Sequence, residues 1–137
     1  MRLVAFPALC AAIAAMLTFA APAHAEKYPV AVFSGLDKIT ARVTSFAVAV
    51  GEPHRYGALE VTVRACDKAP PEEPPQTSAY VEVHQVDPGT GEVQPHAIFK
   101  GWMFAESPGR NALEHPVYDL WVTDCRNSSV GAPSGSE

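Results

Sequence analysis

The feature that most constrains the fold is a strict alternation of apolar and polar residues between positions 59 and 65. Every second residue from Leu59 is apolar, and the residues between them are Glu60, Thr62 and Arg64. Successive side chains of an extended strand point to opposite faces, so this period predicts a strand with one buried face. The same alternation at 79–86 and 117–125 predicts two further strands.

Two other stretches also favour extended structure. Residues 39–50 are rich in β-branched side chains and predict a strand, with a bulge near Ser45 and Phe46 where the alternation fails. Residues 93–104 carry large apolar groups on both faces, which indicates a strand that is buried on both sides or lies at a seam between two sheets.

The segments between these strands contain turn and loop signals. Residues 26–33 contain a proline and predict an edge segment, followed by a turn that Ser34-Gly35 and Asp37-Lys38 mark. Residues 51–57 predict a loop. The proline-rich stretch 69–76 predicts an exposed connector, because proline has no amide hydrogen for a sheet.

The fold class follows from these periods. Beyond residue 25, no stretch longer than ten residues shows a helical apolar period. The chain is therefore predicted to be all-β, a small antiparallel sandwich or partly closed barrel of about five to seven short strands. One short helical turn is expected near 110–115, ahead of Pro116.

The first 25 residues resemble a cleaved signal peptide. A positive start at Arg2, an apolar run and the small residues Ala23 and Ala25 fit the pattern of a leader that is removed after export. Residues 26–126 are then expected to form a single β domain. Residues 127–137, rich in Ser, Gly and Pro, are expected to be a disordered tail. The predicted location is periplasmic, with no stable membrane insertion after cleavage.

The charge of the chain argues against two classes of partner. The formal net charge is −5. Loss of the leader removes one of the ten basic residues and none of the 15 acidic ones, so the remaining net charge is −6. Nucleic acid and anionic membrane surfaces both attract clustered positive charge, so neither is an expected partner. No cofactor is expected either.

Two cysteines, Cys66 and Cys125, remain after the leader is removed. An even number of cysteines in an exported chain predicts a disulfide. The bridge would close a loop of the 58 residues from 67 to 124. A metal pair or a redox pair is the alternative, but the two cysteines lie far apart and do not form a C-x-x-C motif.

Four blocks of the sequence together carry a family resemblance: GLDKITARVTSF at 35–46, LEVTVRAC at 59–66 followed by PPEEPP, GWMFAESP at 101–108, and NALEHPVYDLWVTDC at 111–125. In these blocks the chain resembles domain-of-unknown-function family 2155, which is found chiefly in exported proteins of alphaproteobacteria. The resemblance covers residues 30–125. It implies a bacterial source and a periplasmic location, and it implies no activity and no functional residues.

The most enzyme-like residues are His115 and Asp119, with Glu114 beside them and Ser107 nearby in sequence. A histidine paired with a carboxylate can act as a general base. No nucleophile-elbow motif or H-E-x-x-H motif accompanies the pair. The alternative is that His115 bonds backbone groups in a turn ahead of Pro116.

The candidate metal ligands are Glu82, His84 and His96. The first two share a strand face, and His96 could face them across the turn at 87–91, which would place two histidines and one carboxylate together. The alternative is that these are ordinary residues on an exposed sheet face.

Aromatic residues are concentrated in 101–125, where Trp102, Phe104, Tyr118 and Trp121 are the candidate binding residues. An exposed aromatic cluster would favour a protein partner or a sugar ring, whereas a buried one would be core. The sequence is therefore interpreted as a non-catalytic binding or interaction domain, with another cell-envelope protein as the expected partner. A small periplasmic hydrolase using His115 with Asp119, or an assembly factor for a membrane complex, is the alternative.

Overall fold

The structure is a computed structural model that describes residues 25–128. The predicted leader, except its last residue, and the predicted tail, except its first two residues, lie outside the described residues. Between residues 25 and 128 there is no helix that is long and apolar enough to cross a membrane.

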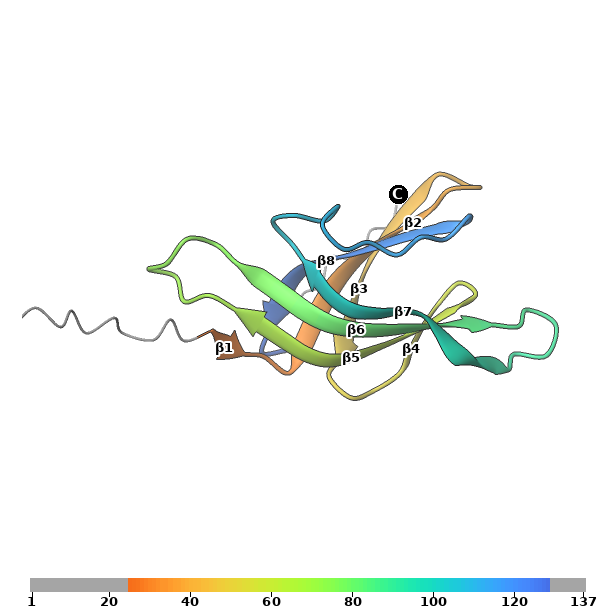
Figure 1. Ribbon diagram of the computed structural model, residues 1–137, viewed down its shortest axis with the longest axis horizontal. Helices are drawn as coiled ribbons and strands as arrows, with labels where there is room; N and C mark the ends of the chain where they lie inside the picture. Colours follow the sequence, from red (N-terminus) through yellow and green to blue (C-terminus); the bar gives the residue numbers. More distant parts are fainter. Residues whose placement is uncertain (1–24, 129–137) are drawn as a thin grey trace, which may run out of the picture.

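Eight strands, grouped into two antiparallel sheets, form within residues 25–128. Sheet A contains β1 (Glu26–Lys27), β4 (His54–Tyr56), β5 (Leu59–Lys68), β6 (Thr77–Val86) and β7 (Val93–Phe104), in the order β1-β5-β6-β7 with β4 beside β5. Sheet B contains β2 (Val30–Asp37), β3 (Arg42–Ala49) and β8 (Tyr118–Arg126), in the order β3-β2-β8. The sheets form two layers whose strands cross at an angle (Figure 1).

The core lies between the two layers. Phe33 and Val48 of sheet B, together with Leu59 and Val81 of sheet A, are almost completely buried and belong to one apolar cluster. The all-β class is confirmed. Of the two predicted forms, the described residues adopt the sandwich, because sheet A and sheet B remain separate and do not close into a barrel.

A disulfide joins Cys66 on β5 to Cys125 on β8, which confirms the predicted pairing. Their Cα atoms lie 5.9 Å apart. Both residues are buried within the core cluster. The bridge therefore ties sheet A to sheet B.

Strand β2 differs from the predicted edge segment and turn. It is the central strand of sheet B, and Ser34 and Gly35 lie within it. The reversal comes after Asp37, whose Oδ1 accepts hydrogen bonds from the amides of Ile39 and Thr40. Ala41 has a φ of 56°, which places the tight part of the turn there. The predicted bulge in β3 is also wrong, because β2 and β3 pair without a register shift.

Register shifts occur instead where β6 pairs with its two neighbours. Its pairing with β7 shifts on either side of His84, and the extra residues of both shifts lie on β7. A bulge changes the face to which the following side chains of its own strand point, so the alternation of β7 is interrupted there. On β6, Val86 lies on the buried face with 3% of its surface exposed, whereas simple alternation from Val81 and Val83 predicts the opposite face.

The short helical turn predicted near 110–115 is wrong. Residues 105–117 form a loop of turns and bends, with no helix. Two consecutive tight turns begin it, closed by bonds from the amide of Ser107 to the carbonyl of Phe104 and from the amide of Arg110 to the carbonyl of Ser107. Leu113 then packs into the core with 4% of its surface exposed. This anchoring outweighs a helical turn, because so short a helix has a costly nucleus.

Candidate functional site

Strand β7 is predicted from sequence to be buried on both sides or to lie at a seam between two sheets, and its exposure on the outer face shows that it is not buried on both sides. It is an edge strand of sheet A, and β6 is its only partner within residues 25–128. Of the five large apolar residues that are most exposed, three lie on β7: Val93 at 37%, Ile98 at 42% and Trp102 at 37%. The other two, Ile39 and Val43, lie on the β2–β3 hairpin. We call residues 93–102, with their unpaired backbone side, the β7 edge.

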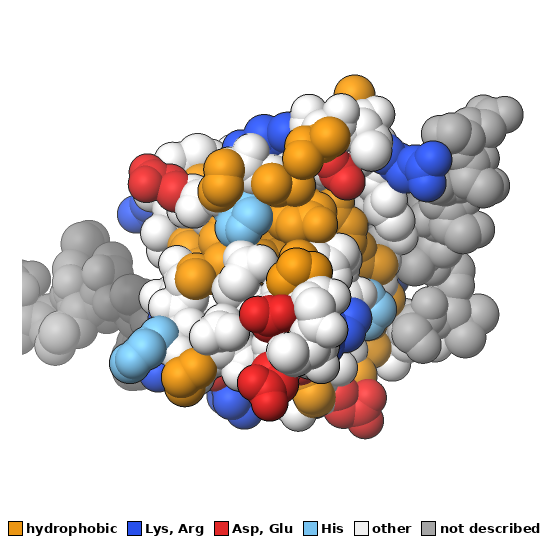
Figure 2. Space-filling model, turned by 90° about the vertical axis from the view of Figure 1, so that its right-hand side faces the viewer, with side chains coloured by type: hydrophobic (Ala, Val, Ile, Leu, Met, Phe, Trp, Pro, Cys, Tyr) orange, Lys and Arg blue, Asp and Glu red, His pale blue; other side chains and the backbone are white. Residues whose placement is uncertain are grey.

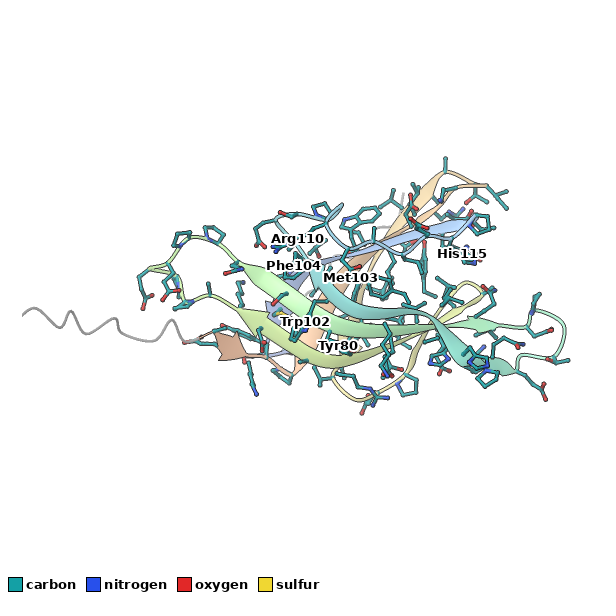
Figure 3. The ribbon with its side chains drawn as sticks, viewed as in Figure 1. Tyr80, Trp102, Met103, Phe104, Arg110 and His115 are labelled. Carbon is teal, nitrogen blue, oxygen red and sulfur yellow. A yellow bond between two sulfur atoms is a disulfide. The ribbon has the colours of Figure 1, made fainter. Side chains whose placement is uncertain are left out.

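Trp102 points away from the core. Its neighbour Met103 is 2% exposed and belongs to the core cluster, so the alternating Trp102 and Phe104 lie on the outer face of sheet A. The Trp102 ring meets the ring of Tyr80 edge to face, with 5.4 Å between centroids (Figure 3). The side-chain amide of Asn111 donates to the Trp102 carbonyl at 2.8 Å. The 105–117 loop therefore covers the β7 edge at this end.

A row of alternating charges crosses the outer face of sheet A beside these rings. Arg64 on β5 donates to Glu82 on β6 at 3.0 and 3.2 Å, and Lys100 on β7 lies 3.3 Å from the other oxygen of Glu82. The hydrogen bond from Arg64, followed by that from Lys100, lowers the pKa of Glu82. Lys100 is the outermost charge of the row and lies at the β7 edge.

The other aromatic candidates lie in different parts of the molecule. The Arg110 guanidinium covers the Phe104 ring at 4.8 Å, beside a small hollow that Ser107 also lines. Tyr118 packs against the core, and its hydroxyl accepts the amide of Ala58 at 3.2 Å. Trp121 lies between buried Leu120 and Val122 on β8 and so points to the outer face of sheet B. The four residues do not form one surface.

His115 is held by three hydrogen bonds. Its Nδ1 accepts the backbone amides of Val117 and Tyr118 at 3.0 and 3.2 Å. An Nδ1 that accepts leaves the ring proton of the neutral form on Nε2, which therefore donates to Gln85 Oε1 at 2.8 Å. The histidine thus links the start of β8 in sheet B to β6 in sheet A. Neither ring nitrogen has a lone pair free to take a proton from a substrate.

Asp119 is engaged by Lys38 and not by His115. Lys38 Nζ lies 2.9 Å from Asp119 Oδ1 and donates to the His115 carbonyl at 2.7 Å. No hydrogen bond joins the His115 ring to Asp119 in the described part of the chain. These residues and Glu114 line a shallow, open hollow. Figure 2 shows the end of the molecule at which the two sheets diverge, where apolar side chains gather in the middle of the face with a histidine beside them.

The three candidate metal ligands are also separated. Glu82 is paired with two cations, and His84 Nδ1 lies 2.8 Å from the carbonyl of Gln94. Opposite His84 on β7 lies Ala97, not His96. Within residues 25–128 no group of three or more histidine, cysteine, aspartate or glutamate side chains is arranged to hold a metal ion.

The bonding of His115 predicts a loss of stability in mild acid. Burial, and then the charge of Lys38, lowers the pKa of His115 below its usual 6.5. The unfolded chain therefore takes up the proton first, so this contribution to stability is complete above about pH 6.5 and declines as the pH falls toward the folded-state pKa. Denaturant unfolding measured from pH 8 to pH 5 should show the decline.

The variant His115→Asn separates this effect from other titrations. An asparagine oxygen can accept the same two backbone amides and does not titrate. Burial also lowers the pKa of His54, so His54 adds a decline of the same sign that remains in the variant. A pH dependence that is identical in the parent and His115→Asn would show that His115 makes no contribution.

Sequence reasoning missed most of the β7 edge. Lys100, Ile98 and Val93 were treated as parts of a buried strand, and only Trp102 was named as a candidate. Pro95 did indicate an edge position for the first residues of this strand, because proline is confined to the edges of sheets, but it gave no information on residues 98–102.

Comparisons with known proteins identify the family of the chain. A curated protein of Rickettsia prowazekii (strain Madrid E), described as "Uncharacterized protein RP359", is 28% identical over 90 residues, which is 66% of this chain and 56% of the relative. The chain thus spans little more than half the length of that relative. No solved structure matches. Residues 31–125, which contain β3 to β7 and nearly all of β2 and β8, match the family described as "Uncharacterized protein conserved in bacteria (DUF2155)". The chain belongs to this family.

Proposed function

We propose that this chain is an exported, non-catalytic binding domain whose partner is another protein of the bacterial cell envelope. One observation carries the proposal, namely that Val93, Ile98 and Trp102 are exposed on a single edge strand. Val93 pairs with the buried Val86 at the far end of the strand, so Ile98 and Trp102 are the residues on which the argument depends. Apolar side chains exposed along one strand are typical of protein interaction sites. Tryptophan is also among the residues that contribute most to such interfaces.

Two further observations support a periplasmic location. The leader-like residues 1–25 would direct export. The bridge between Cys66 and Cys125 suits the oxidising periplasm, since disulfides are rare in the reducing cytosol. Detection of the protein in a periplasmic fraction, with Glu26 as its first residue, would test both points.

The arrangement around His115 favours binding over hydrolysis. A general base needs a free lone pair, and both ring nitrogens of His115 are engaged. Asp119, which would orient the histidine in a catalytic pair, is bound to Lys38 instead. The assembly-factor alternative would use the same surface as the proposed domain and differs in the partner.

The proposal predicts that partner capture depends on the β7 edge. Ile98→Ser and Trp102→Ser should each weaken capture of an envelope protein from a native extract by about tenfold or more, as expected for central interface residues. Val43→Ser is the matched control, because Val43 is 52% exposed but lies on sheet B. Capture can be quantified with a photo-crosslinking residue at position 96, whose side chain is exposed.

The control variants show whether the partner binds at the β7 edge or at the β2–β3 hairpin. Ile98→Ser and Val43→Ser should unfold near the temperature of the parent, since both changes are at exposed positions. Trp102→Ser also loses the ring contact with Tyr80, so its thermal unfolding must show that it is folded at the temperature of the capture experiment. Loss of capture in Val43→Ser alone would move the site to the β2–β3 hairpin. Equal capture by every variant would show that the β7 edge is not the binding surface.

A further inference from the structure

The backbone of the β7 edge has a defined orientation. In an antiparallel ladder the N–H and C=O of one residue point to the same side, and successive residues alternate. The Trp102 carbonyl is bound by Asn111, which belongs to the 105–117 loop and not to β6, so Trp102 faces the open side. Lys100, two residues earlier, therefore directs its N–H and C=O to the open side as well.

Two rows of side chains end at this edge. The charges of Arg64, Glu82 and Lys100 alternate in sign across three neighbouring strands. Beside them, Tyr80 on β6 contacts Trp102 on β7. Both rows lie on the outer face of sheet A. Each row crosses the sheet toward the open side of β7, where an additional strand could pair. Cross-strand neighbours of opposite charge, and aromatic pairs, are the contacts that stabilise adjacent strands.

We infer that the β7 edge binds an extended segment of a partner protein as an added strand, with a carboxylate beside Lys100 and an apolar or aromatic side chain beside Trp102. The inference rests on the proposed binding function and specifies its mode. Strand addition supplies main-chain hydrogen bonds from the backbone, while alternate side chains supply specificity. Because Asn111 occupies the Trp102 carbonyl, the added strand ends opposite Trp102.

A second copy of this chain is a poor occupant of the edge. An edge lysine opposes pairing with a strand that offers it no opposite charge, and β7 itself carries Lys100 and no acidic residue. The chain also has a net charge of −5, so two copies repel each other at long range. An added strand that bears an acidic residue would be directed to Lys100 rather than to the remainder of this acidic protein.

The test uses a library of random nonapeptides displayed on phage and selected against the protein produced from the full-length chain. Enriched peptides should alternate apolar and polar residues, with Asp or Glu two positions from an apolar or aromatic residue. For synthetic peptides of this pattern, Glu at that position should give about two- to fivefold tighter binding than Lys, the range of a cross-strand charge pair. In the variant Lys100→Glu the preference should reverse.

Two more variants test the side-chain charge of Lys100 and its backbone N–H separately. Lys100→Gln should retain binding but lose the preference for Glu over Lys. Lys100→Pro removes the outward N–H and leaves the hydrogen bonds to β6 in place, so it should abolish binding in a folded protein. In the parent, amide hydrogen exchange at Lys100 should slow when the peptide binds. Thermal unfolding of each variant confirms that it is folded.

The outcomes distinguish this inference from the proposed function. If an envelope protein still depends on Ile98 and Trp102 while Lys100→Pro and Lys100→Glu bind it normally, strand addition is wrong and the binding function stands. Selected peptides that lack acidic residues would overturn the predicted specificity. A dimer that Lys100→Pro disrupts would show that the occupant is a second copy. If neither peptides nor envelope proteins respond to any β7 variant, both proposals fail.

Discussion

The double variant Cys66→Ala/Cys125→Ala is expected to lower the free energy of unfolding by about 2–5 kcal/mol. The bridge joins residues separated by 59 positions and connects the two sheets. Opening it lets the unfolded chain explore far more conformations, which the chain-entropy account values at about 4 kcal/mol for a loop of this length. Urea unfolding of the oxidised parent and the variant, monitored by tryptophan fluorescence, measures the difference.

Reduction provides the matched control for this prediction. A reductant should destabilise the parent to nearly the same extent as the double substitution and should leave the variant unchanged. Since the chain from Glu26 to Glu137 has only 112 residues, its core is modest and the bridge is a large part of its net stability. If the parent has the same unfolding free energy with and without reductant, the disulfide contributes nothing to stability.

The parts of the fold that could be predicted are those with one buried and one exposed face. In β5, Leu59, Val61 and Val63 are completely buried between the sheets and Arg64 is exposed, as the alternation predicts. Thr62 is buried as well, and a register shift between Val63 and Ala65 ends the alternation there. The pairing of Cys66 with Cys125 could be predicted for a simpler reason, because no other cysteine lies beyond residue 25. These features depend on local chemistry and do not require knowledge of the neighbouring strands.

Strand β2 could not be recognised because it has no alternation. Its first four residues, 30–33, are all apolar and all buried, since both faces of this central strand are covered. The environment of strand β7 could not be predicted for the opposite reason. Its apolar residues lie on both faces, as in a buried strand, but Val93, Ile98 and Trp102 are exposed. A sequence cannot distinguish apolar residues that its own fold buries from those left at an open edge.

The candidate site depends on contacts between residues far apart in sequence. His115 was considered as a catalytic base because Asp119 lies close to it in sequence, yet its partner is Gln85, 30 positions away on another sheet. Lys38, 77 positions away, binds the His115 carbonyl, and the same amine pairs with Asp119. The alternative reading of His115, as a residue that satisfies backbone groups in a turn, agrees with the bonds at its Nδ1.

Gly35→Ala is expected to lower the free energy of unfolding by about 1–3 kcal/mol, the usual effect of overpacking a filled interior. A methyl group at Gly35 would overlap the ring of Tyr56. That ring cannot move aside easily, because it is stacked at 5.1 Å on Phe46 and meets Tyr118 edge to face at 5.5 Å. Gly35 has no left-handed φ, so backbone strain does not contribute to the effect.

Gly109→Ala is the matched control, because an added methyl group there would meet nothing within 4 Å. Its unfolding free energy should stay within about 0.5 kcal/mol of the parent value, as for most surface substitutions. Tyr56→Leu, which removes the ring, should reduce the cost of Gly35→Ala, and a double-mutant cycle measures this coupling. If Gly35→Ala were as stable as Gly109→Ala, Tyr56 could not be packed on Gly35. Tyr56 lies on β4, so this contact is one of those that pack sheet A against β2, the central strand of sheet B.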